Sequence, residues 1–165
     1  MSTITTSQNV LFASAKARDA ISFGFSVGSD GDVCGGNGED VIAYCFASIQ
    51  GYSKIGSYTG NGNADGPFIY TGFKPAFLIF KRTDAANNWG MIDSKRDPYN
   101  VTGNELYADL SQAESTGNTA VDFLSNGFKV RTSAARLNAS GGTYIYMAFA
   151  DQSLVGTNNV IALAR

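Results

Sequence analysis

Residues 66–84, GPFIYTGFKPAFLIFKRTD, contain two short apolar runs that predict neighbouring β-strands. The runs, residues 68–71 and residues 76–82, are rich in aromatic and β-branched side chains, which pack well on a pleated surface. Gly72 and Pro75 lie between them and favour a turn. Because residues 76–82 are mostly apolar, we expect this strand at the centre of a sheet, buried on both faces.

The residues that follow predict a hairpin and one further short element. An Asp-Ala-Ala-Asn-Asn turn at residues 84–88 leads into an apolar segment at residues 89–94. A turn of this composition between two apolar runs is typical of a hairpin, so residues 89–94 should pair with residues 76–82. Farther along, residues 106–114 should form a short strand or a turn of helix.

The last third of the chain carries two more strand signals. Asn126 and Gly127 stand between two phenylalanines, and an Asn-Gly pair in this setting is a recognised hairpin signal. Residues 141–150, GGTYIYMAFA, alternate between two sets of side chains, as expected for a strand with one face toward a core. One face should carry Tyr144 and Tyr146, and the other Ile145, Met147 and Phe149.

The composition favours the same fold class. The chain has 165 residues, of which 19 are Gly, 8 Tyr and 11 Phe, and this combination suits strands joined by tight turns. A chain of this length favours one domain with a proper core over two small ones. We therefore expect an all-β fold, a β-sandwich of jelly-roll or lectin-like type, built from short antiparallel strands with Gly-rich turns.

Charge and hydropathy exclude two classes of partner. The net charge is −2 and the 12 Lys and Arg residues are scattered, so the basic surface that binds a phosphate backbone is missing. The chain also lacks an apolar run of about 18 residues, and its N-terminus does not have the pattern of a signal peptide. We expect neither nucleic-acid binding nor membrane insertion, and synthesis in a cytoplasm.

An internal repeat relates the first third of the chain to the last third. A shift of 103 positions without a gap superposes residues 24–47 on residues 127–150, and seven of these 24 pairs are identical. Both copies run from Gly-Phe-x-Val through a loop into a segment that ends in Phe-Ala. Internal duplication explains this better than two hairpins of similar composition, which is the alternative.

The duplication is incomplete, and this sets the expected organisation. Residues 1–51 should be the terminal strands of a partial first copy, residues 52–152 a complete module, and residues 153–165 a C-terminal tail. Half a module cannot cover its own apolar face, so its strands should join the sheets of the complete module or pair with another chain. In either arrangement the protein would be a building element, not a free-standing catalyst.

Three motifs in this order resemble a known family. They are GSYTGNG at residues 56–62, TGFKPAF at residues 71–77 and SGGTYIYMAFA at residues 140–150. The chain from about Gly24 to its end is similar to a module of unassigned function in virion proteins of tailed bacteriophages. In that family the module lies mostly at the C-terminal end of tail-fibre-like and other structural proteins, often behind a lectin-like jelly-roll domain.

The resemblance implies a place on a phage particle and supplies no catalytic residues. The expected partners are other virion proteins, and the expected assembly is a homo-oligomer, with a trimer suited to a fibre tip. Two roles compete: the end of a tail fibre or related appendage, and a capsid decoration that fastens neighbouring shell subunits. A third hypothesis is a lectin-like module for a host-surface glycan or protein receptor, which would require an aromatic shelf beside Asn and Asp hydrogen-bonding groups.

The chain has no histidine, and this excludes several kinds of catalytic and metal site. Without a histidine the chain cannot form a Ser-His-Asp triad, a Cys-His pair or a His-bearing zinc site. Paired carboxylates of the glycosidase kind remain as an alternative, but nothing in the sequence places two of them about a sugar apart. The available residues are Glu39, Asp40, Asp93, Glu105 and Glu114. We expect a protein that is not an enzyme.

Two segments are similar to calcium-binding loops. NGNADG at residues 61–66 begins correctly, but Gly72 occupies the twelfth position, where a bidentate Glu is needed. SDGDVCGGNGED at residues 29–40 offers oxygen donors from Asp30, Asp32, Glu39 and Asp40. We interpret these acids as solvated turn residues and expect no cofactor, with a bound calcium ion as the alternative.

Six residues are candidate contacts for a partner or receptor. A charged turn contains Lys95, Arg96 and Tyr99, and the turn NGNADG contains Asn61 and Asn63. Trp89 would be an aromatic anchor at a binding surface, whereas the alternative places it inside the sandwich.

Overall fold

The structure, a computed structural model, describes residues 44–151. Within these residues the strands are β1 (Ser53–Thr59), β2 (Phe68–Tyr70), β3 (Pro75–Arg82), β4 (Gly90–Asp93), β5 (Leu106–Tyr107), β6 (Val121–Leu124), β7 (Gly127–Val130) and β8 (Thr143–Ala150), and α2 (Ala135–Asn138) is a single helical turn. The chain divides into two units, Met1–Ser48 and Ile49–Arg165, and every strand named here belongs to the second. Residues 1–43 of the partial first copy lie outside the described residues. The predicted strand that ends in Phe-Ala is not found where the structure describes it, because residues 44–48 form no strand.

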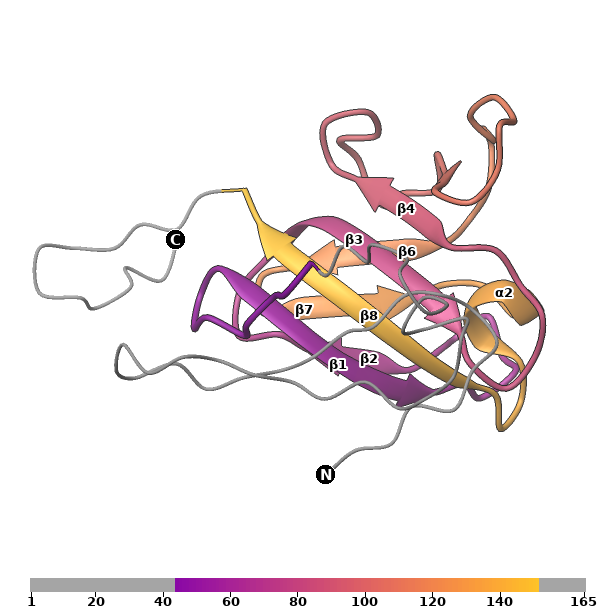
Figure 1. The fold of residues 1–165 in the computed structure, drawn as a ribbon, viewed down its shortest axis with the longest axis horizontal. Coiled ribbons are helices and arrows are strands. Elements are labelled where there is room, and N and C mark those ends of the chain that lie inside the picture. The colour runs from indigo at the N-terminus through magenta and orange to yellow at the C-terminus, as the bar shows by residue number, and fades with distance from the viewer. Residues whose placement is uncertain (1–43, 152–165) are drawn as a thin grey trace, which may run out of the picture. The chain divides into compact units, whose positions relative to one another are not determined.

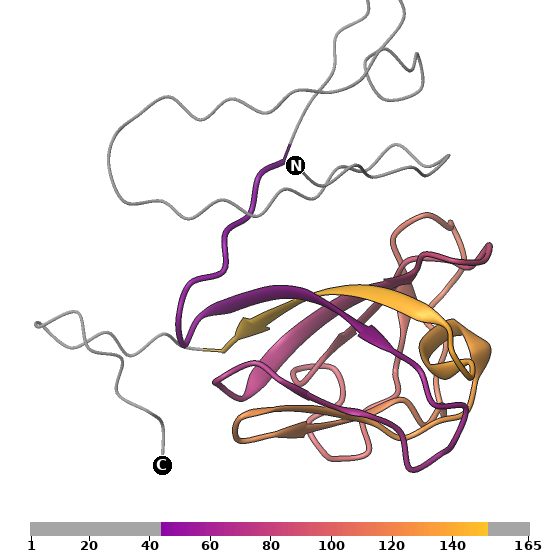
Figure 2. The same ribbon diagram turned by 90° about the horizontal axis from the view of Figure 1, so that it is seen from below.

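The strands form two antiparallel sheets, which confirms the predicted all-β class. The larger sheet has the order β1-β8-β3-β4-β5 and the smaller has the order β2-β7-β6. The two sheets are seen face on in Figure 1 and nearly edge on in Figure 2, where one layer lies above the other. Side chains from their facing surfaces pack together, as in a β-sandwich.

Strand β3 lies in the middle of the larger sheet, between β8 and β4, as its sequence predicted. Leu78 and Phe80 point into the core and are 0% and 1% exposed. Phe77 and Ile79, on the opposite face, are only half-buried. The expectation of burial on both faces was therefore wrong, because the smaller sheet covers one side of β3 only.

Both predicted hairpins are present. Strand β4 pairs antiparallel with β3, from Phe77 opposite Asp93 to Phe80 opposite Gly90. Strands β6 and β7 pair through a two-residue turn, with Leu124 opposite Gly127. The turn lies one residue earlier than the Asn-Gly signal indicates, so Gly127 begins the strand.

Strand β8 confirms the predicted alternation. Tyr144 and Tyr146 face the core, and Met147 lies on the other face together with half-buried Ile145 and Phe149. The element expected in residues 106–114 is the short strand β5, which pairs with β4.

Strand β1 was not predicted from the sequence, although it pairs with β8 along its whole length. Its sequence, SKIGSYT, has only two large apolar side chains, Ile55 and Tyr58. It lies at an edge of the larger sheet, where neighbours, not its own pattern, stabilise it.

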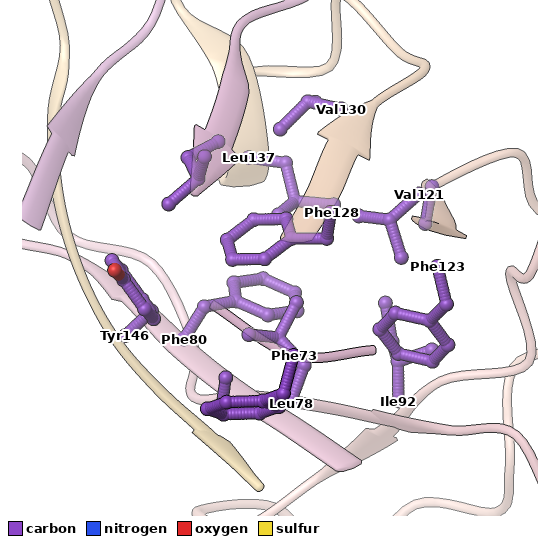
Figure 3. Packing of buried hydrophobic residues seen from close by; sticks show 13 residues of the cluster. Phe73, Leu78, Phe80, Ile92, Val121, Phe123, Phe128, Val130, Leu137 and Tyr146 are labelled. Carbon is purple, nitrogen blue, oxygen red and sulfur yellow. The ribbon is translucent and has the colours of Figure 1, made fainter. Parts of the chain in front are cut away.

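The core is a continuous cluster between the two sheets (Figure 3). Phe128 of β7 lies near its centre, with the Tyr146 ring 5.3 Å away in an edge-on arrangement. The other members are Ile69, Phe73, Leu78, Phe80, Ile92, Ala120, Val121, Phe123, Val130, Leu137 and Ala148.

The turn α2 is held in place by two tyrosines from the larger sheet. Tyr58 and Tyr144 stack with ring centroids 4.9 Å apart. The Tyr58 hydroxyl donates to the Leu137 carbonyl at 2.8 Å, and the Tyr144 hydroxyl donates to the Ala135 carbonyl at 2.7 Å. Burial, with the neighbouring Tyr144 as the next cause, raises the pKa of Tyr58 well above its ordinary value, so the hydroxyl remains a donor. These bonds satisfy carbonyl groups that so short a helix leaves unpaired.

Candidate binding surface

Trp89 is buried, with 8% of its surface exposed. Its backbone N–H donates to Asp109 Oδ1 at 3.1 Å, and its carbonyl accepts from the Ala108 N–H at 3.2 Å. Trp89 is therefore not an exposed anchor. It is buried, but it is not a member of the apolar cluster between the two sheets.

Arg96, on the loop after β4, joins two carboxylates, one at the end of β4 and one in the chain that follows β5. Its guanidinium pairs with Asp93 and with Glu114, which is 18 residues farther along the chain. Burial opposes ionisation of Asp93, but hydrogen bonds from the Arg96 and Lys95 backbone and from the Arg96 side chain hold the pKa of Asp93 below its ordinary value. Lys95 forms an exposed pair with Asp151 at 2.9 Å. Arg96, a predicted contact residue, is therefore engaged in two ion pairs within the chain.

Tyr99 is 81% exposed, so its side chain is available for contact. The loop that carries it pairs with the outer edge of β6. Thr102 and Val121 exchange two backbone hydrogen bonds, and the Asn100 side chain bonds both the N–H and the carbonyl of Phe123. This pairing covers part of a sheet edge that would otherwise offer free backbone groups.

Asn61 and Asn63 are exposed members of a loop that closes on itself. The Asn63 N–H donates to Asn61 Oδ1 at 2.9 Å, and the Asp65 N–H donates to Asn63 Oδ1 at 2.9 Å. The fully buried Asn138 completes the loop, because its Nδ2 donates to Asn61 Oδ1 and to the Asn63 carbonyl. An amide group from α2 therefore binds both asparagines of the loop, whose first residues are similar to a calcium-binding loop.

Replacing Asn138 with alanine should destabilise the protein by about 1–3 kcal/mol, because the partly buried hydrogen bonds between this fully buried amide and the loop would be lost. Besides the bonds above, Asn138 Oδ1 accepts from the Asn61 N–H at 2.7 Å. Urea unfolding monitored by circular dichroism would measure the change. Asn88→Ala, at an exposed turn residue, is the control and should change stability by less than about 0.5 kcal/mol. Equal losses would show that the network contributes nothing.

The carboxylates considered for glycosidase chemistry are in structural ion pairs where the structure describes them. Arg96 binds Asp93 and Glu114, as noted. Glu105 has a side chain with no exposed surface, and its Oε2 lies 2.8 Å from Arg136 Nε. Burial raises the pKa of Glu105, although Arg136 and Tyr107 lower it. Glu39 and Asp40 lie outside the described residues.

Two aromatic rings stand exposed on the outward face of the smaller sheet. Phe68 is 46% and Tyr70 is 65% exposed, whereas Ile69 between them points into the core. In the register of β2 and β7, Phe68 lies opposite Lys129 and Tyr70 lies opposite Gly127. We call Phe68 and Tyr70 the aromatic shelf.

Glycine backbone lies against the Phe68 ring of the aromatic shelf, and the Tyr70 hydroxyl lies near Gly72. A Cβ atom added to Gly127 would lie 2.8 Å from Phe68 Cζ, so the Phe68 ring rests against the bare backbone of β7. A Cβ atom added to Gly72 would lie 3.6 Å from the Tyr70 hydroxyl. Gly127 is therefore needed in the strand for close approach.

Two ion pairs border the aromatic shelf. Lys129 Nζ lies 2.5 Å from Asp65 Oδ1, and Arg131 Nε lies 3.5 Å from Asp122 Oδ2. Asp122 is opposite Lys129 in the register of β6 and β7, so both lie on the face that carries Phe68. The hydrogen bond from Lys129 lowers the pKa of Asp65. Charged groups are thus held beside the rings.

The sequence contained a signal for the aromatic shelf that we did not use. Phe68, Ile69 and Tyr70 are three successive large apolar residues in one strand, and alternation must turn either the first and third or the second outward. Only the register of β2 with β7 shows that Phe68 and Tyr70, and not Ile69, face outward.

The described residues contain no group of three or more His, Cys, Asp or Glu side chains that could hold a metal ion. The alternative calcium ligands Asp30, Asp32, Glu39 and Asp40 lie outside these residues, so that hypothesis stays untested. In residues 44–151 no helix is long and apolar enough to cross a membrane.

Comparisons with known proteins identify a family and no individual relative. Neither the curated proteins nor the solved structures contain a significant match to the chain. Residues 2–153 match a family described as a domain of unknown function, DUF7483. This match spans both the described sandwich and the preceding segment. The chain therefore belongs to the DUF7483 family.

Proposed function

We propose that this protein is a non-enzymatic structural module exposed on a tailed-phage virion, where it works through surface contacts in a tail fibre, a related appendage or a capsid decoration. The proposal rests on a contrast between carboxylates that are held in ion pairs and aromatic side chains that are exposed. Asp93, Glu105 and Glu114 are engaged in structural ion pairs, whereas Phe68 and Tyr70 remain exposed on a sheet. Such an arrangement suits recognition more than catalysis.

The motifs on which the resemblance to phage virion modules rests lie in the framework of the fold. Residues 56–62 cover the end of β1 and the loop after it, residues 71–77 lead into β3, and residues 140–150 contain β8. These three strands are neighbours in the larger sheet. The similarity therefore concerns the framework of the fold and does not depend on one variable loop.

Immunogold electron microscopy of purified particles would test the proposal. Antibodies raised against the whole chain should label particles at the tail fibres or on the capsid, and preincubation with the purified protein should abolish the label. The position of the gold distinguishes appendage from decoration. Recovery of the protein only in the particle-free fraction of a lysate would contradict a virion role.

A second candidate function, glycan recognition, is favoured by the aromatic shelf. A lectin-like module requires exposed aromatic rings beside hydrogen-bonding side chains. Phe68 and Tyr70 are exposed rings of this kind, and Asp122 lies on the same face, with Lys129 in place of the expected asparagine.

A further inference from the structure

We infer that the aromatic shelf is a binding site for a neutral glycan, with sugar rings stacked on Phe68 and Tyr70. The inference deepens the proposed function and rests on it for the source of the ligand, because a virion meets glycans on the host surface. The chemistry of binding follows from the described side chains alone.

Phe68 and Tyr70 project from the same face of a strand that is paired with β7. Residues two apart on a strand project from the same face and lie about 7 Å apart along it. Phe68 rests on the Gly127 backbone, and β7, which carries Gly127, is the central strand of the smaller sheet. On the inner face of this sheet Ile69 and Phe128 are buried in the core. Little ordering of the protein is therefore needed on binding, which favours affinity.

A saccharide matches this surface chemically. One face of a pyranose presents C–H groups, which pack on an aromatic ring, while its hydroxyl groups lie around the rim. An aromatic ring offers a large apolar area, and the Tyr70 hydroxyl adds a polar group. Lys129 supplies a donor directly beside Phe68, and Asp122 supplies an acceptor one strand farther away on the same face. Charged partners form the stronger hydrogen bonds.

The charge balance points to a neutral ligand. Lys129 pairs with Asp65 and Arg131 pairs with Asp122, so each cation beside the shelf has a carboxylate partner. A single-stranded nucleic acid also stacks on aromatic rings, but it requires a positively charged groove along its backbone. The net charge of −2 is likewise unfavourable for a polyanion.

The size of the apolar surface argues against a protein partner at this place. A stable protein interface buries about 800 Å² on each side and involves about 20 residues or more. The aromatic shelf presents two large apolar side chains, and its surroundings are charged. Two rings suit a sugar or a short saccharide.

Glycan binding by the full chain would test the inference. An array of neutral glycans, followed by calorimetry with the best ligand, should detect binding that changes little between low and high salt. Tyr70→Ala and Phe68→Ala should each weaken binding at least about tenfold, whereas Tyr70→Phe keeps the ring and should retain it. Leu110→Ala removes a 41% exposed apolar side chain from another loop and should have no effect. Circular dichroism would show that each variant folds.

Three outcomes would overturn the inference. They are the absence of binding to any neutral glycan, binding only to heparin or to a single-stranded oligonucleotide, and glycan binding that is lost with Tyr99→Ala but not with Tyr70→Ala. Particle labelling is an independent readout. If the shelf binds a glycan but the protein is absent from particles, the virion role is contradicted and the glycan site is retained. If particles are labelled but no glycan binds, the glycan site is contradicted and the virion role is retained.

Discussion

Replacing Phe128 with alanine is expected to lower the free energy of unfolding by about 3–5 kcal/mol. The ring has no exposed surface, and Tyr58 and Tyr146 meet it edge-on from the opposite sheet. Its removal would leave a cavity between two paired sheets that cannot collapse without breaking strand pairing. Since domains are typically stable by about 5–15 kcal/mol, such a loss could leave the fold barely stable.

Phe68→Ala is the matched control, because it deletes the same ring from the partner strand of β7. Phe68 faces outward and is 46% exposed, so we expect a loss of about 1 kcal/mol or less. Urea denaturation of both variants, followed by far-ultraviolet circular dichroism, provides the comparison. Losses of similar size would mean that the assignment of inward and outward faces in the smaller sheet is wrong.

Replacing Arg136 with methionine is expected to destabilise the protein by about 3–5 kcal/mol at pH 7, because it leaves the buried Glu105 carboxylate without its cation. The other oxygen, Oε1, already has no hydrogen-bond partner among the described residues. It faces Gly90, where an added Cβ atom would lie only 2.5 Å away. Arg136 is therefore the cation that compensates the charge of the buried Glu105 carboxylate.

The effect of Arg136→Met should depend on pH with a definite sign. Burial raises the folded-state pKa of Glu105 above its ordinary value of 4.5, even though Arg136 opposes this shift. A group with a raised pKa contributes stability that is fully present below the unfolded value and is lost as pH rises through the folded value. Loss of Arg136 should raise the pKa further, so the variant's deficit relative to the natural protein should shrink as pH falls toward 4.

The double variant Glu105→Gln with Arg136→Met separates charge from packing. It removes both charges while keeping a side chain of similar shape at position 105, and it should recover most of the stability lost in Arg136→Met at pH 7. Thermal melting of the single and double variants at pH 4 and pH 7 would measure this. A deficit that is the same at both pH values, with no recovery in the double variant, would assign the loss to packing alone.

The sequence predicted most strands, because strand signals are local. The alternation in residues 143–150 and the turn residues before β4 and near β7 depend on neighbours within a few positions. Strand β1 was not predicted because SKIGSYT shows little of this alternation. Its hydrogen-bond partner is β8, which lies near the other end of the chain. Gly127, predicted to be a turn residue, belongs to strand β7 because it pairs with Leu124 of β6 and with Tyr70 of β2.

Of the six predicted contact residues, the structure leaves Asn61, Asn63, Lys95 and Tyr99 exposed, uses Arg96 to bind two carboxylates, and buries Trp89. The pattern of residues alone does not separate these cases, because an exposed and an ion-paired arginine look alike in a charged turn. The sequence pattern places Phe68 and Tyr70 in a strand, but it does not show that both side chains are exposed. Their exposure depends on which face the smaller sheet turns toward the core.

The amino-acid sequence by itself determined the all-β class, the central place of β3 and the absence of histidine chemistry, since composition, periodicity and turn residues act over short distances. Only the tertiary structure decided which groups meet across long separations. Asn138 completes a loop 77 residues earlier, and Arg136 neutralises Glu105, 31 residues earlier. The aromatic shelf belongs to the second kind, because the register between β2 and β7, and not the pattern of either strand, turns its two rings toward solvent.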